Sequence, residues 1–210
     1  MFNCNMKSII WKIYHYFALI AHVGVNIRNE GEGTLKTDIR GNYNTIEILG
    51  GAKIDHPLII INGNNNRILI GKNCKIRKGT IFRIDGDNVT ISIGDNTTLQ
   101  HDDIIVAQHA DIHIGTDCMF SNHIHIRSSE SHPIYDNETR EWINRNKEVK
   151  IGNHVWLAAN CKILKGVSIH DDAVVGAHSV VTKDVLPNTI VAGNPARTVK
   201  NNVTWERSLR

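Results

Sequence analysis

Aliphatic residues recur at every sixth position in the stretch from residue 151 to residue 185. The recurring residues are Ile151, Leu157, Ile163, Ile169, Val175 and Val181. A period of six differs from the 3.6 of an α-helix and from the simple alternation of a β-strand. It is typical of a β-solenoid built from short repeats. The stretch therefore predicts an all-β solenoid with three six-residue units in each triangular coil.

Two further positions of the six-residue unit are restricted. Counting the aliphatic residue as the first, the fourth residues are His154, Asn160, Gly166, Asp172, His178 and Asp184. The fifth residues are small or β-branched, and they are Val155, Cys161, Val167, Ala173, Ser179 and Val185. Gly, Asn, Asp and His are the residue types that best tolerate the positive φ of a sharp corner. We expect a corner at each fourth position and parallel strands ~4.8 Å apart, with Ile151 stacked on Ile169.

A looser form of the unit, an apolar-x-apolar pair followed by Gly, extends the pattern toward the N-terminus. Its anchors are Ile48, Ile70, Ile93, Ile114 and Ile151, separated by 22, 23, 21 and 37 residues. The first three steps fit one coil with residues added at a corner, and GNNN at 63–66 and GDN at 86–88 read as such corners. Residues 26–45 are polar and glycine-rich and show no strong pattern.

The step of 37 indicates an insertion, because it exceeds one coil by about the length of a long loop. The inserted residues lie between Arg127 and Lys147, are mostly polar, and include His132 and Pro133. Long loops that project from a regular scaffold frequently carry function. We therefore expect the chemistry of the protein in the loop 128–148.

Composition narrows the class of protein. The 210 residues are 41% hydrophobic but only 6% aromatic, as expected of a core made from Ile and Val, and the net charge of +3 gives no reason to expect nucleic acid. Cys74, Cys118 and Cys161 occupy small fifth positions. Without a CxxC motif they read as core residues of a protein in the reducing cytoplasm.

The two ends of the chain differ from the solenoid. Residues 1–25 form an apolar segment interrupted by Lys12, His15 and His22, which is too short and polar to span a membrane. Within it, residues 7–22 predict an amphipathic helix that packs on the first coil or at a subunit contact, or else binds a membrane surface. The solenoid domain is expected over residues 26–200. Residues 186–210, with a Gly193-Asn194-Pro195 turn, predict a cap and tail.

The motifs of the second half resemble those of the hexapeptide-repeat acyltransferases. The resemblance rests on IGNHVWLAANCKILKGVSI at 151–169, VVGAHSVVTKDV at 174–185, VAGNPAR at 191–197 and SHP at 131–133. It is closest to the O-acetyltransferases of bacterial capsule and O-antigen polysaccharides. The resemblance implies a left-handed parallel β-helix that assembles as a homotrimer, with acetyl-CoA bound between neighbouring subunits.

Three residues are implied as catalytic. His132 matches the family's catalytic histidine, and a neutral imidazole can take the proton from an attacking hydroxyl. Glu130 could orient that imidazole, although the relatives usually carry Asp there, and a solvated loop acid is the alternative. Trp156 is expected to point outward, either at a subunit interface or beside the acceptor and the pantetheine arm.

The resemblance also implies residues that bind the substrates. The donor residues would be Ala159 and Ala177 in the groove, Thr182 and Lys183 near the nucleotide, and Arg197 and Lys200 at the phosphates. The acceptor residues would be His101, Asp103, Ser121 and His123, although His101 stands where sugar-specific relatives carry Asn, and corner geometry alone explains His123. The spacing of the histidines does not fit the zinc site of the related carbonic anhydrases, so no metal is expected.

These observations favour transfer of an acetyl group from acetyl-CoA to a hydroxyl of a surface polysaccharide or its sugar precursor. An N-acetyltransferase of an amino sugar and an antibiotic acetyltransferase of the same fold remain alternatives, as does a solenoid that serves as a non-catalytic scaffold.

Overall fold

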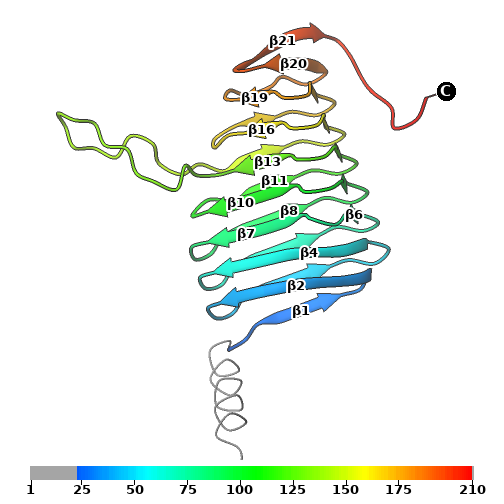
Figure 1. Ribbon diagram of the computed structural model, residues 1–210, viewed down its shortest axis with the longest axis vertical. Coiled ribbons are helices and arrows are strands. Elements are labelled where there is room, and N and C mark those ends of the chain that lie inside the picture. The colour runs from blue at the N-terminus through cyan, green and yellow to red at the C-terminus, as the bar shows by residue number, and fades with distance from the viewer. Residues whose placement is uncertain (1–22, 210) are drawn as a thin grey trace, which may run out of the picture.

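The computed structural model describes residues 23–209 of the chain as a parallel β-solenoid. Its coils rise along one axis, and a long hairpin leaves the side of the stack near its C-terminal half (Figure 1). The prediction of an all-β solenoid is confirmed. The amphipathic helix expected within residues 7–22 lies outside the described residues.

Each complete coil contributes strands to three faces. The first face contains β1 (Asn26–Asn29), β3 (Thr45–Ile48), β5 (Arg67–Ile70), β8 (Thr90–Ile93), β11 (Ile112–Ile114), β14 (Val149–Ile151) and β17 (Ser168–Ile169). The second face contains β6 (Lys75–Ile76), β9 (Thr98–Leu99), β12 (Met119–Phe120), β15 (Trp156–Leu157), β18 (Val174–Val175) and β20 (Thr189–Gly193). The third face contains β7 (Ile81–Asp85), β10 (Ile104–Gln108), β13 (His125–Arg127), β16 (Lys162–Ile163) and β19 (Val180–Val181). The long strands β2 (Glu32–Arg40) and β4 (Lys53–Asn62) run across both the second and third faces.

The strand register follows the six-residue pattern. Ile151 pairs with Ile169, and the same parallel register joins the aliphatic residues of the other two faces, Leu157 with Val175 and Ile163 with Val181. These side chains are buried in one continuous core along the axis of the solenoid. Burial of aliphatic surface between coils is therefore the main stabilising contribution.

The corners form where the fourth positions predict them. Five of the six fourth residues have positive φ, and they are His154, Asn160, Gly166, Asp172 and His178. Asp184 is the exception, and its carboxylate instead accepts a hydrogen bond of 2.8 Å from the backbone N–H of Ser168. The segments 63–66 and 86–88 are turns between the third and first faces, as the sequence predicts.

The first coil begins earlier than the sequence pattern indicates. Residues 26–45 contain β1 and β2, which pair with β3 and β4. The strand β1 is exposed along its whole length, and only Leu35 and Ile39 of β2 pack on the core. Within the described residues, no further coil packs on the outer side of this first coil. Few inward aliphatic residues are therefore needed here, and the sequence shows no hydrophobic period.

The C-terminal end departs from parallel pairing. The strand β21 (Ala196–Asn201) pairs antiparallel with β20 at the last coil. Residues 202–209 then run back along the side of the stack opposite the hairpin, and Arg207 binds Asp117 at 2.9 Å (Figure 1). Residues 23–209 contain no helix that is long and apolar enough to cross a membrane.

Candidate functional site

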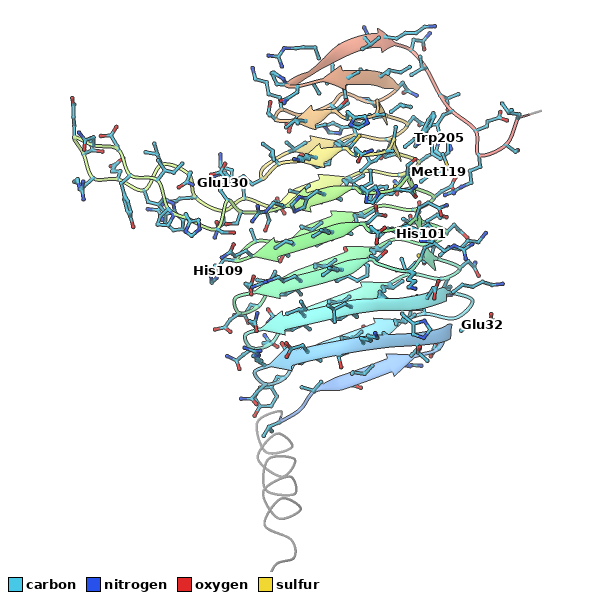
Figure 2. The ribbon with its side chains drawn as sticks, in the orientation of Figure 1. Glu32, His101, His109, Met119, Glu130 and Trp205 are labelled. Atoms are coloured by element: carbon cyan, nitrogen blue, oxygen red, sulfur yellow. The ribbon has the colours of Figure 1, made fainter. Side chains whose placement is uncertain are left out.

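The inserted segment between β13 and β14 folds as a hairpin at the corner between the third and first faces. Tyr135 and Trp142 form an antiparallel bridge across it, and the backbone N–H of Ile143 donates to the carbonyl of Ile134 at 2.9 Å. The hairpin projects away from the coils (Figure 2). The polar loop expected over residues 128–148 is therefore an ordered element with its own hydrogen bonds.

Asn144 joins the two arms of the hairpin. Its side-chain oxygen accepts hydrogen bonds from the backbone N–H of Ile134 and from the indole N–H of Trp142, each at 2.6 Å. Its side-chain nitrogen donates to Glu130 Oε2 at 2.7 Å and to the backbone carbonyl of His132 at 2.9 Å. One amide thus fixes the backbone on which His132 sits.

Lys165 fastens the hairpin to the next coil. Its ammonium group lies 2.7 Å from Glu130 Oε2 and 2.6 Å from the backbone carbonyl of Asn144, and its side chain is only 14% exposed. The hydrogen bonds from Lys165 and Asn144 hold the pKa of the Glu130 carboxyl below its usual value. Neither Lys165 nor Asn144 was found from the sequence, because a lysine and an asparagine at coil and loop positions carry no distinguishing signal.

The role expected for Glu130 is not what the geometry shows in the described residues. Its carboxylate is bound to Lys165 and Asn144 rather than to the ring of His132. Two cationic or amide donors compete better for a carboxylate than a neutral imidazole does. In this structure Glu130 thus contacts Lys165 and Asn144, the two residues that hold the hairpin, and its role in orienting the imidazole stays a prediction.

His132 is exposed at a small cavity between the hairpin and the coils. This cavity, here called the hairpin pocket, has a volume of about 200 Å³ and lies between Gln108 and His109 of the coil and Tyr135 and Trp142 of the hairpin. An imidazole at such an opening can meet a hydroxyl group that enters from solvent. His109 of the coil lines the same pocket as His132, although the sequence pattern does not single it out.

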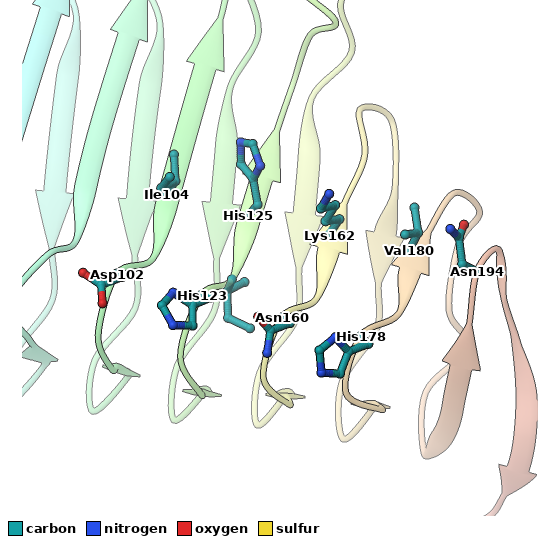
Figure 3. Close-up of a pocket in the computed structure, with 10 residues that line it drawn as sticks. Asp102, Ile104, His123, His125, Asn160, Lys162, His178, Val180 and Asn194 are labelled. Atoms are coloured by element: carbon teal, nitrogen blue, oxygen red, sulfur yellow. The ribbon is translucent and has the colours of Figure 1, made fainter.

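A second, larger cavity lies at the corner between the second and third faces. This corner groove has a volume of about 630 Å³ (Figure 3). One wall is a row of corner residues from Asp102 to His178, and the other is a row of strand residues from Ile104 to Val180. Ala159 and Ala177 directly precede two of these corner residues, Asn160 and His178.

The residues expected to bind the donor do not gather at one corner of the described chain. Ala159 and Ala177 lie between the second and third faces, whereas Thr182 and Lys183 follow β19 at the corner that leads to the first face. Arg197 and Lys200 are exposed on β21. His132 belongs to the hairpin corner, at the opposite edge of the third face from Ala159.

The expected acceptor residues are divided between surface and core. His101 and Ser121 lie at or near the corner between the second and third faces. His123 has a positive φ at this corner and lines the corner groove. The prediction that Asp103 contacts the acceptor is wrong, because its side chain is completely buried. One of its oxygens accepts a hydrogen bond of 2.8 Å from the backbone N–H of Ile124, and the other has no partner within residues 23–209. Burial raises the pKa of this carboxyl to about 7.

Trp156 faces outward on the second face, away from the hairpin of its own chain. Its ring lies 6.1 Å from that of Trp205, which is 7% exposed and stacks on His154 at 4.2 Å. The indole N–H of Trp156 is buried and makes no hydrogen bond within residues 23–209. Figure 2 shows Trp205 on the side of the solenoid opposite Glu130. The repeat pattern does not predict a role for Trp205, because this residue lies in the tail beyond the repeats.

The cysteines at the fifth positions are core residues, as predicted. Cys74, Cys118 and Cys161 are free thiols with no exposed surface. Burial raises the pKa of Cys74 and of Cys118 to about 11, and it also raises the pKa of Cys161. Within residues 23–209, no group of three or more His, Cys, Asp or Glu side chains is arranged to hold a metal ion.

Comparison with known proteins places the chain in a family. The sequence profile described as bacterial transferase hexapeptide (six repeats) matches residues 148–183. The polysialic acid O-acetyltransferase of Neisseria meningitidis is 39% identical, over 84% of this chain and 92% of that protein. The protein of the same name from Escherichia coli O1:K1 is 37% identical over 78% of this chain, which spans only 45% of that longer protein.

Solved structures agree with these relatives. The polysialic acid O-acetyltransferase OatWY superposes with a TM-score of 0.82 at 35% identity, with 90% of each chain covered. The polySia-specific acetyltransferase NeuO gives the same TM-score at 31% identity, covering 89% of this chain and 87% of the other. The resemblance read from the motifs is confirmed, and the chain belongs to the hexapeptide-repeat acetyltransferases, in the group that contains the polysialic acid O-acetyltransferases.

Proposed function

We propose that this enzyme transfers an acetyl group from acetyl-CoA to a hydroxyl of a capsular polysaccharide, and that polysialic acid is the first acceptor to test. The observation that carries the proposal is the exposed His132 on a clamped hairpin, in a chain that matches OatWY over 90% of both lengths. The two sequence relatives described above support the same acceptor.

The chemistry needs one proton acceptor. As the hydroxyl oxygen attacks the thioester carbonyl carbon and the C–O bond forms, the neutral imidazole of His132 takes the hydroxyl proton. Collapse of the tetrahedral intermediate breaks the C–S bond, and the imidazolium returns the proton to the departing thiolate. A positioned base of this kind contributes roughly 10²–10⁴-fold in rate.

We propose that the active site forms between copies of the chain in a homotrimer. Ala159 and His132 lie at the two edges of the third face, so a threefold arrangement about that face would bring one edge of each copy to the other edge of its neighbour. The outward side chains Ile81, Ile104, Val106 and Val180 of this face are partly exposed and apolar, which favours an interface. The same arrangement would bring Thr182 and Lys183 toward the corner groove of the next copy.

Transfer is expected to be direct, in a ternary complex that holds both reactants together. The buried cysteines of the described residues are protonated and enclosed, which argues against an acetyl-cysteine intermediate. We place the reaction in the cytoplasm, where thiols stay reduced. Association of the N-terminal segment with a membrane stays a prediction.

The test is release of CoA thiol from acetyl-CoA with a panel of acceptors. The panel contains polysialic acid, a neutral capsular polysaccharide, an amino sugar and chloramphenicol. We expect turnover with polysialic acid, and a loss of at least about a hundredfold in kcat for His132→Ala. His113→Ala on the first face serves as the histidine control and should keep normal turnover. Acetylation of the amino sugar or the antibiotic alone would contradict the proposal.

A further inference from the structure

The hairpin pocket combines flat aromatic surfaces with hydrogen-bonding groups. Tyr135, Trp142 and Pro133 supply the flat surfaces, and the amides of Gln108 and Asn146 supply donors and acceptors. A sugar ring has apolar C–H faces that pack on aromatic rings and equatorial hydroxyls that need amide or hydroxyl partners. Its volume of about 200 Å³ lies below the ~300–1,000 Å³ of drug-sized sites, so the pocket fits one ring rather than an oligosaccharide.

The surroundings of the pocket are positively charged. Arg127 donates from Nη2 to Ser131 Oγ at 2.8 Å on the pocket wall, and its Nε is buried without a hydrogen-bond partner in the described part of the chain. The guanidinium carbon of Arg145 lies 5.1 Å from the centre of the Trp142 ring, on the other arm of the hairpin. Each arginine therefore contacts a residue of the pocket wall, Ser131 or Trp142, without lining the pocket itself. A guanidinium group suits a planar carboxylate, to which it can donate two parallel hydrogen bonds.

No carboxylate among the described residues lines the pocket and cancels this charge. The neighbouring acids already have partners, because Glu130 binds Lys165 and Asn144, and Asp85 binds Arg83 at 2.7 Å. Asp136 accepts hydrogen bonds from the backbone at the tip of the hairpin. An acidic sugar would therefore find two guanidinium groups near the aromatic surfaces and no carboxylate of the described residues on the pocket wall.

We propose that the hairpin pocket binds a single carboxylated sugar residue of the acceptor and presents its hydroxyl to His132. The inference rests on the proposed function and adds the subsite in which one sugar residue binds and the residues that hold it. Tyr135 and Gln108 hold the ring, and Arg127 and Arg145 select the carboxylate. The acceptor residues predicted from the sequence, His101, Ser121 and His123, lie instead at the corner between the second and third faces.

The test separates ring binding from charge selection. Tyr135→Ala and Gln108→Ala are expected to raise the acceptor KM for polysialic acid by about tenfold while the KM for acetyl-CoA stays unchanged. Ile143→Ala is the matched control, because Ile143 is an exposed hairpin residue that does not line the pocket. Arg127→Gln and Arg145→Gln should raise the KM for polysialic acid but not for the same polymer with its carboxyl groups reduced to alcohols.

Binding is measured independently of turnover, by calorimetry. The ligand is an oligosaccharide of three sialic acid residues, and the protein is the full chain in the oligomeric state in which it purifies. Loss of binding in Tyr135→Ala but not in Ile143→Ala supports the pocket even if no acetyl transfer occurs, in which case the proposed function alone fails. If the wild type acetylates polysialic acid and the pocket variants keep an unchanged acceptor KM, the pocket inference alone fails. Equal KM changes for the charged and reduced polymers in the arginine variants would overturn the selection of an acidic sugar.

Discussion

The ammonium group of Lys165 lies 2.7 Å from Glu130 Oε2 and ties the start of the hairpin to the following coil. It also reaches the carbonyl of Asn144 at 2.6 Å, so one lysine holds both arms of the hairpin. Two of its three N–H donors are used on the element that carries His132. Because the Lys165 side chain is mostly buried, holding it in this geometry costs little additional conformational entropy.

Lys165→Met should therefore reduce activity through the position of His132. We expect kcat to fall by roughly ten- to a hundredfold because the base loses its fixed distance from the acceptor, while the coils keep their thermal midpoint. Steady-state kinetics and a thermal melt measure the two effects. Lys150→Met is the control, since Lys150 forms an ion pair with Glu148 on the first face. A variant with normal kcat would show that the clamp is not needed.

Asn144 makes a second, more specific prediction. Asn144→Asp keeps the oxygen that accepts from Ile134 and Trp142 but places a second carboxylate beside Glu130. The lost donor and the repulsion between like charges should loosen the backbone of His132 and lower kcat by at least about tenfold. Protonation of the new carboxylate should recover part of the loss, so the deficit relative to wild type should shrink as the pH falls. A deficit that does not change with pH would exclude charge repulsion as the cause.

The pattern of the sequence predicts the frame well and the site only in part. Ile151, Leu157 and Ile163 predict their stacking partners because inward aliphatic residues repeat with the coil, and His154 and His178 predict corners because few residue types accept positive φ. Asp103 occupies the fifth position of its unit, as Cys161 does. Because fifth positions point into the core, the repeat pattern itself argues against Asp103 as an acceptor contact. Lys165 and Trp205 act across the chain on residues 35 and 51 positions away, and no local pattern records such contacts.

Trp205 should stabilise the last coils more than its place in the tail suggests. Its indole stacks on His154 with an angle of 7° between the rings and donates to the carbonyl of His154 at 2.7 Å. Removing the ring in Trp205→Ala should cost roughly 2–4 kcal/mol in the free energy of unfolding, and Trp205→Phe should cost less because the stack remains. Urea unfolding measures both. Leu209→Ala, at a fully exposed tail position, should have no effect. Equal stability of all three variants would show that the tail does not contribute.

Asp103 should make the stability of the protein fall as the pH rises. Burial raises the pKa of its carboxyl from 3.8 to about 7, so the folded state holds a proton that the unfolded chain releases between these two values. The loss of folding free energy is absent below pH 3.8, grows as the pH rises and is complete above about pH 7. It then amounts to on the order of 4 kcal/mol. Asp103→Asn removes the ionisation and keeps an oxygen for the backbone N–H of Ile124. The variant should match wild type near pH 4 and exceed it near pH 8 in the free energy of unfolding measured by urea. The exposed neighbour Asp102 provides the control, because Asp102→Asn removes only a secondary contribution to the raised pKa of Asp103, so stability should still fall as the pH rises. Parallel profiles for Asp103→Asn and wild type would show that Asp103 does not carry this proton.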